Sequence, residues 1–355
     1  RLAKEKSEQG IDNAMYLRQY GYKISYDAFC KQKFRPDYYF IYLNEKVKDA
    51  PNILKLPEGD YLCFRERILE EAWNPQRIIS YFQGKAKPEL IKQVHKNYFK
   101  AGADCGITCS YQASIPGLME NGYTLEEAEN LIRSAVKIFC EARDEWWEEE
   151  GREAGRAWPL CLGAAGPYGA YLADGSEYRG NYGITDEQLK EFHKRRVELL
   201  HEAGADIILF ETVPSLKAEI AEEYGYDYWI SFSCLSENII CEGTPIAECA
   251  KTFAKGYPHL KMIGVNCTKP EYITGLIHKI KENCDIPIGV YPNSGEEYDA
   301  VKKVWFGKQS ALSFEQYAYN YMKSGASAVG GCCTTVAKHV EEVVRAKKRF
   351  SEEQK

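Results

Sequence analysis

The chain has 355 residues, of which 45% are hydrophobic and 28% charged, values that are ordinary for a folded soluble protein. Lys and Arg number 46 against 52 Asp and Glu, so the formal net charge is −6 and we expect no binding to nucleic acid. No apolar run reaches the roughly 18 residues that a membrane-spanning helix needs. The first ten residues, RLAKEKSEQG, lack the apolar core of a secretion signal. The thirteen cysteines are therefore expected to be cytoplasmic thiols or metal ligands rather than a disulfide framework.

Three segments begin with the same helix-start signal, a capping box. In this motif a Ser or Thr hydroxyl caps the helix, and an acid or amide three residues later reaches back to it. Apolar residues follow at helical spacing, which predicts an amphipathic helix after each box. The three pairs are Thr124 with Glu127, Thr185 with Gln188, and Ser313 with Gln316.

Short apolar runs follow a repeated helix-stop signal. The tetrapeptides AGAD, AGAD and SGAS each place a glycine where a helix C-terminus favours a left-handed residue. Short apolar runs bounded by turn signals are candidate buried parallel strands. Seven such runs occur after residue 85, namely 105–110, 159–164, 207–212, 229–234, 262–267, 288–292 and 328–333.

Strands that alternate with helix-length segments predict an α/β protein, and residues 83–350 have the size of a (β/α)8 TIM-type barrel, about 250 residues. An open doubly wound sheet is the alternative, but no G-x-G-x-x-G follows a strand. Residues 1–82 differ. They are rich in Tyr and Lys, contain strand-like runs at 38–43 and 61–65, and predict a small α+β segment.

Three cysteines at predicted strand ends are the sharpest chemical signal. Cys267 ends GVNC, and Cys332 and Cys333 end VGGCC. Reactive groups of a parallel barrel gather at the C-terminal ends of its strands, and a catalytic zinc takes three protein ligands and keeps one open position. Gly330 and Gly331 are expected to allow unusual backbone angles, so that both adjacent cysteines reach one ion. From spacing alone, a redox-active pair and inert core cysteines remain alternatives.

Other polar residues stand at the same predicted rim. Glu211 is a candidate to bind a substrate ammonium group, or alternatively to cap a helix. Asn293 is a candidate to contact a substrate, or alternatively to form a turn. Gln112 follows a strand as a substrate-binding candidate. The tract 166–179 is expected either to cover the site or to be a packed surface loop. Its three tyrosines are candidates to face a cation through their rings, and they are Tyr168, Tyr171 and Tyr178.

Several further residues predict packing rather than ligation. Cys105 and Cys109 are expected on one face of a strand. The histidines follow no metal-binding pattern, and His95, His193 and His201 are expected on charged helix faces.

Eight tracts resemble the homocysteine S-methyltransferase family, over about residues 87–344. They are ELIKQVH, YFKAGAD, ITCSYQAS, GPYGAYLADGSEYRGNY, FETVPS, GVNC, YPNSGEEYDA and GGCCTT. The long tracts are most similar to the branch that uses S-methylmethionine or S-adenosylmethionine as methyl donor. The resemblance implies a zinc-dependent barrel that transfers a methyl group from the sulfonium donor to the thiol of L-homocysteine, giving methionine.

The resemblance also implies residue roles. Cys267, Cys332 and Cys333 match the zinc ligands, and Glu211 matches the residue that contacts the homocysteine amino group. Asn293 matches a residue that occupies the fourth zinc position when no substrate thiol is bound.

The family's first strand, roughly D-G-A/G-x-x-T-E-L, is missing from residues 1–82. The runs 38–43 and 61–65 are candidates to replace it. The alternative function is a fused or decayed barrel with a ligand-sensing N-terminal segment and little or no methyltransferase activity.

Overall fold

The computed structural model describes residues 88–299, 304–306, 310 and 312–354. The predicted segment 1–82, its strand-like runs and the boundary at residues 82 and 83 lie outside this part of the chain, so that division stays a prediction.

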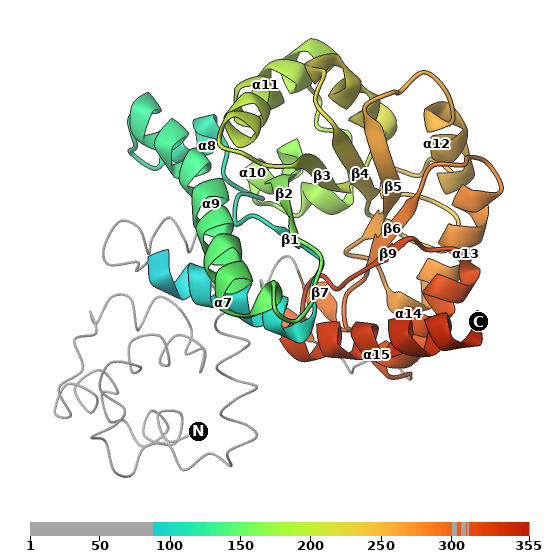
Figure 1. Cartoon of the computed structure of the whole chain (residues 1–355). Helices are drawn as coiled ribbons and strands as arrows, with labels where there is room; N and C mark the ends of the chain where they lie inside the picture. The colour runs from blue at the N-terminus through green and yellow to red at the C-terminus, as the bar shows by residue number, and fades with distance from the viewer. Residues whose placement is uncertain (1–87, 300–303, 307–309, 311, 355) are drawn as a thin grey trace, which may run out of the picture. The chain divides into compact units, whose positions relative to one another are not determined.

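All seven predicted strands form, and they pair in parallel in the order β1-β2-β3-β4-β5-β6-β9. Figure 1 shows the sheet curling as it runs from β1 to β9, with helices on its outer side. Within the described residues β1 and β9 are the two edges, so the structure contains a curled seven-stranded sheet and not the expected closed barrel of eight. The strands are β1 (Cys105–Ile107), β2 (Leu160–Ala165), β3 (Ile207–Val213), β4 (Tyr228–Phe232), β5 (Leu260–Asn266), β6 (Ile288–Tyr291) and β9 (Ala328–Val329).

Helices connect the strands, as a parallel sheet requires. The α-helices are α7 (Pro88–Ala101), α8 (Ile115–Glu120), α9 (Leu125–Trp146), α10 (Tyr168–Leu172), α11 (Asp186–Glu202), α12 (Ile246–Phe253), α13 (Pro270–Lys281), α14 (Phe314–Ser324) and α15 (Ala337–Glu353). The shorter elements are the helices η2 (Trp147–Gly151), η3 (Ser176–Tyr178) and η4 (Leu216–Tyr224) and the hairpin β7 (Glu297–Asp299) and β8 (Val304–Phe306). A membrane-crossing helix is not found in the described ranges.

The repeated start and stop signals set the ends of these helices. Complete capping boxes open α9, α11 and α14, with the hydroxyl accepting the backbone N–H three residues on and that residue's side chain accepting in return. The predicted stop glycines are left-handed, with φ of +111° at Gly102, +102° at Gly204 and +116° at Gly325. Each glycine ends a helix and turns the chain into the next strand.

The two faces of the sheet carry two separate apolar clusters. Ile208 and Phe210 of β3 point outward into the large core beneath the helices. Leu209, between them, points the other way and packs with Trp229 and Tyr291 on the inside of the curl. This alternation follows from the two-residue period of a strand, and it leaves a smaller interior cluster under the rim.

Three expectations for individual side chains are wrong. His95 and His193 do not lie on charged faces: they are buried, with 2% and 5% of their surfaces exposed. Cys105 and Cys109 do not share a strand face, because β1 ends at Ile107 and the chain turns. Cys105 packs against the inner cluster, whereas Cys109 packs against α7 and α9.

Strands β5 and β6 approach each other through a pair of glycines, Gly264 and Gly289. A Cβ at Gly264 would collide with the carbonyl oxygen of Gly289. This oxygen is a backbone atom, so it cannot move aside by a change of rotamer. Gly264→Ala is therefore expected to lower the free energy of unfolding by about 3 kcal/mol.

Gly275, inside α13, is the matched control, since its Cβ would meet only the flexible carboxylate of Glu237 at 3.3 Å. Gly275→Ala is expected to raise stability by about 0.5–1 kcal/mol through helix propensity. Urea unfolding measures both, and equal effects of the two variants would contradict the close approach.

Acid should destabilise the fold through His95. Burial lowers the pKa of His95 to about 3, from an ordinary 6.5. Between these values the unfolded chain binds a proton that the folded chain does not. The stability contributed by neutral His95 is therefore complete above about pH 6.5 and is lost as the pH falls towards 3, by about 1.4 kcal/mol per pH unit. His95→Gln is expected to show a shallower fall in unfolding free energy between about pH 6 and pH 5, and parallel curves would exclude this role.

Candidate metal and substrate site

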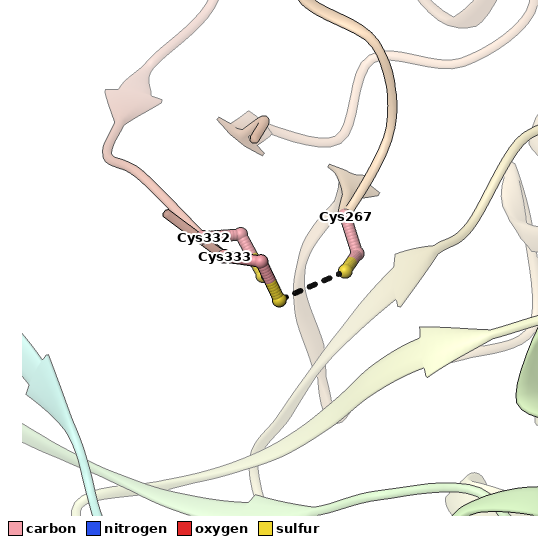
Figure 2. A group of neighbouring side chains, drawn as sticks. All are labelled: Cys267, Cys332 and Cys333. Atoms are coloured by element: carbon pink, nitrogen blue, oxygen red, sulfur yellow. Dashed lines mark hydrogen bonds between the residues drawn. The ribbon is translucent and has the colours of Figure 1, made fainter. Parts of the chain in front are cut away.

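The three predicted cysteines meet at the C-terminal ends of β5 and β9. The Sγ atom of Cys333 lies 3.5 Å from that of Cys267 and 3.9 Å from that of Cys332. All three sulfurs lie within 4.8 Å of one another. Figure 2 shows the adjacent pair on one loop facing Cys267 on another. The chain therefore gathers three soft ligands around one point.

The backbone leaves regular strand geometry on both sides of this cluster. Cys267 and Thr334 adopt positive φ, +49° and +64°, which is unusual for residues other than glycine. Gly331, one of the two glycines expected to allow unusual backbone angles, provides space instead: a Cβ at this position would collide with the side chain of Thr335. The amide of Cys332 donates to the carbonyl of Pro292 at 2.8 Å and anchors the loop. Beyond β9 the strand alternation no longer applies, so adjacent cysteines can turn to the same side.

The thiols influence one another strongly. Hydrogen bonds from Cys267 and Cys333 hold the pKa of Cys332 well below its ordinary value. Contacts with Cys267 and Cys332 raise the pKa of Cys333, and the contact with Cys332 raises that of Cys267. Three sulfur donors at this spacing fit zinc, which binds thiolates in tetrahedral sites.

Asn266 supports the cluster from the end of β5. It is fully buried; its Oδ1 accepts the Thr212 amide at 2.8 Å and its Nδ2 donates to the Thr212 hydroxyl at 2.8 Å. The same Nδ2 lies 3.8 Å from the Sγ of Cys332. Thr212 needs this support, because its φ is +58° in an irregular part of β3. The sequence analysis missed Asn266, although it directly precedes Cys267.

Glu211 of β3 is a buried acid beside this network, with 6% of its surface exposed. Burial raises its pKa well above the ordinary value, and the charge of Cys332 raises it further. Glu211 makes no ion pair within the residues that the structure describes. Such an acid suits a cationic ligand group, which would restore its charged form.

The tract 166–179 places a tyrosine hydroxyl against the cluster, not a ring face. The Tyr178 oxygen lies 3.2 Å from the Sγ of Cys267. Tyr168 packs edge-on against Tyr171 and Phe192, with ring centroids 5.3 and 4.9 Å apart. Tyr171 also donates to Glu120 at 2.6 Å. The expected contact of these three rings with a cation stays a prediction.

The two predicted amides follow two separate strands, Gln112 after β1 and Asn293 after β6. Gln112 donates to the carbonyl of Ala170 at 3.5 Å, and Asn293 donates its backbone N–H to the carbonyl of Thr268 at 3.2 Å. The side-chain oxygens of Gln112 and Asn293 are buried and lack hydrogen-bond partners in the described structure. Both therefore have an acceptor available for a ligand.

Arg196 of α11 fixes the rim loops and was also missed by the sequence analysis. Its guanidinium, 1% exposed, donates to the carbonyls of Gly166 at 2.6 Å and Ala113 at 3.4 Å. It also lies 2.7 Å from Nδ1 of His193. Burial and the charge of Arg196 hold the pKa of His193 well below its ordinary value, so the imidazole is neutral and accepts this bond. One buried side chain thus joins the loops after β1 and β2.

Comparisons with known proteins agree with this geometry. The model of the family "Homocysteine S-methyltransferase" matches residues 61–347, beginning 87 − 61 = 26 residues before the expected start. A homocysteine S-methyltransferase of Bacillus subtilis is 45% identical over 263 residues, 72% of this chain and 83% of the relative. One of Zea mays is 42% identical over 270 residues, again 72% and 83%. The homocysteine methyltransferase MmuM of Escherichia coli, in its metallated form, superposes with a TM-score of 0.65 at 32% identity, covering 78% of this chain and 87% of that one.

The contacts of Asn266 predict a large effect on stability. Asn266→Ala leaves the buried amide of Thr212 without its acceptor, so the free energy of unfolding is expected to fall by about 2–4 kcal/mol. Asn283→Ala is the control, because it removes only a half-buried hydrogen bond to the Lys279 carbonyl, and it is expected to cost below about 1 kcal/mol. Chemical denaturation of both variants measures the difference, and a loss at Asn266 no larger than at Asn283 would refute the bridging role.

Proposed function

This chain belongs to the homocysteine S-methyltransferase family, and from that membership we propose that it methylates L-homocysteine at a zinc site formed by Cys267, Cys332 and Cys333. The methyl donor is a sulfonium compound, S-methylmethionine or S-adenosylmethionine, and the product is methionine. The observation that carries the proposal is the convergence of the three sulfurs within 4.8 Å.

The donor set supports the choice of metal. Three thiolates bind zinc and leave the fourth position of a tetrahedral site for a substrate. A bound zinc ion would lower the pKa of the homocysteine thiol and keep it as the reactive thiolate at neutral pH. Asn266 would orient Cys332, and the Tyr178 hydroxyl would hold Cys267, as groups around metal ligands commonly do.

The chain's own residues would position the acceptor. Glu211, buried beside the cluster, accepts the ammonium group of homocysteine and gains a cationic partner. Asn293 fills the space of the substrate sulfur before homocysteine binds. Gln112 and Tyr168 line the rim from the loops that Arg196 fixes.

The reaction itself needs little further chemistry. The homocysteine sulfur donates an electron pair to the methyl carbon and forms a carbon–sulfur bond. The bond from that carbon to the sulfonium sulfur breaks, and its electron pair stays on the departing sulfur, which becomes a neutral thioether. The task of the site is therefore to align donor and acceptor while excluding water.

We also propose that the curled sheet is part of a closed eight-stranded barrel. The named relatives are enzymes, which favours catalysis over the alternative of a fused or decayed barrel that senses a ligand.

Metal content and methyl transfer test the proposal together. Wild type is expected to retain about one zinc per chain and to convert homocysteine to methionine with S-methylmethionine or S-adenosylmethionine. Cys332→Ala removes one of three ligands, so bound zinc should fall to a small fraction and the rate by about a hundredfold or more. Elemental analysis and product detection measure the two quantities.

Cys284→Ala is the matched control, because Cys284 is another buried thiol that lies outside the cluster. It is expected to keep both zinc and activity. Full zinc and full activity in Cys332→Ala would reject the mechanism, and a reversible Cys332–Cys333 disulfide without bound metal would support a redox role instead.

A further inference from the structure

A second acid, Glu177, lies in the tract that covers the site. It belongs to the short helix η3, and its backbone is held tightly on two sides. A Cβ at Gly169 would collide with the Glu177 amide, and the hydroxyl of Ser233 donates to the Glu177 carbonyl at 3.4 Å. The position of this acid is therefore set by the fold of the tract against the end of β4.

The Glu177 side chain lacks a partner for one oxygen. Its Oε2 is buried, and no hydrogen bond reaches it from the described residues. The hydroxyl of Tyr182 is buried and unpartnered in the same way. The two residues share a neighbour in the tract: the Tyr182 ring lies 5.5 Å from that of Tyr168, and the next residue, Gly169, packs against the Glu177 backbone. Burial raises the pKa of Tyr182, and the charge of Glu177 raises it further. Arg179 does not neutralise Glu177 directly, since its exposed guanidinium pairs with Asp174 at 3.1 Å.

Tyr178 relates this acid to the cysteine site. It directly follows Glu177 in η3, and its hydroxyl lies 3.2 Å from the Sγ of Cys267. Glu211 belongs to another element, β3, where Asn266 accepts the amide of the next residue, Thr212, and lies 3.8 Å from the Sγ of Cys332. The two acids therefore come to the sulfur cluster from two different elements, η3 and β3.

We propose that Glu177, with the Tyr182 hydroxyl, binds the α-ammonium group of the methyl donor and thereby determines donor specificity. This assignment rests on the proposed function. Each of the two substrates carries one α-ammonium group, and the site offers two acids, the buried Glu211 and the half-buried Glu177 with its buried Oε2. Glu211 beside the cysteines serves the acceptor, whose sulfur must reach the metal, and Glu177 serves the donor.

The chemistry favours the ammonium over the sulfonium as the partner of Glu177. The sulfonium loses its positive charge as the methyl group leaves, so a carboxylate beside it would stabilise the bound donor more than the transition state. The ammonium charge stays constant, so binding it costs nothing in the methyl-transfer step. An ammonium group also has three N–H donors, enough for both the free Oε2 and the Tyr182 hydroxyl.

Two probes separate these possibilities, S-methylmethionine and its desamino analogue, 4-(dimethylsulfonio)butanoate, which keeps the sulfonium and lacks the ammonium. Glu177→Gln keeps the size of the side chain and removes its charge. We expect this variant to weaken S-methylmethionine binding by about 10- to 100-fold and analogue binding by less than about twofold. The KM for homocysteine should also change by less than about twofold. Tyr182→Phe should show the same pattern with a smaller loss, about three- to tenfold.

Calorimetric titration of the zinc-loaded protein in the absence of homocysteine measures donor binding without turnover, and steady-state kinetics with homocysteine supply both KM values. Glu187→Gln, an exposed acid at the start of α11, is the control and should match wild type throughout. Unchanged S-methylmethionine binding in both Glu177→Gln and Tyr182→Phe overturns the assignment, as does an equal loss for the analogue. If wild type binds the donor through Glu177 but transfers no methyl group to homocysteine, the proposed function fails and the assignment stands.

Discussion

The convergence of three sulfurs on one point is the constraint around which the rim of this protein is built. Cys267 comes from the end of β5, and Cys332 and Cys333 come from the end of β9, about 65 residues later in the chain. Such a meeting requires the backbone to abandon strand geometry at both places, and the positive φ of Cys267 and Thr334 shows that it does. Residues in such conformations persist only where their surroundings hold them. Here the Tyr291 carbonyl accepts the Cys267 amide at 3.3 Å, and the Ser294 hydroxyl lies 2.6 Å from that of Thr334.

The rest of the rim continues this pattern of support from buried polar groups. The Arg196 guanidinium donates hydrogen bonds to carbonyls of two loops. It also donates one to Nδ1 of the neutral His193. Buried polar groups are costly unless their hydrogen bonds are made. Those of Asn266 and Arg196 are largely made by the chain, whereas Gln112, Glu177 and Asn293 each keep an unused oxygen. The unused acceptors therefore mark where a ligand, and not the protein, completes the structure.

Local signals in the sequence were sufficient for the secondary structure. The capping boxes at Thr124, Thr185 and Ser313 and the left-handed Gly204 depend on residues close in sequence, and the apolar runs between them became the seven strands. Strand ends of a parallel sheet lie on one edge, so the order of the strands was enough to predict that the cysteines meet.

Contacts between distant segments were not predictable in the same way. The spacing of His193 and Arg196 predicts that they are neighbours on one helix face. It does not predict that this face is buried, because that depends on how α11 packs over two loops. The contacts of the tyrosines in the tract 166–179 depend on such packing too: Tyr178 presents its hydroxyl to Cys267, and Tyr168 packs against Phe192. Burial alone does not decide which part of an amphipathic side chain faces a site.

The shortness of β9 has a consequence for the whole C-terminal portion of the sheet. This strand is attached to β6 through only two residue pairs, Gly289 with Ala328 and Val290 with Val329, yet it carries the loop that holds two of the three sulfurs. An ion shared with Cys267 would act as a cross-link across that weakly paired edge, much as a disulfide does. Loss of the ion would then loosen the last strand and the helices around it. The stability of the fold would therefore depend on the concentration of free metal.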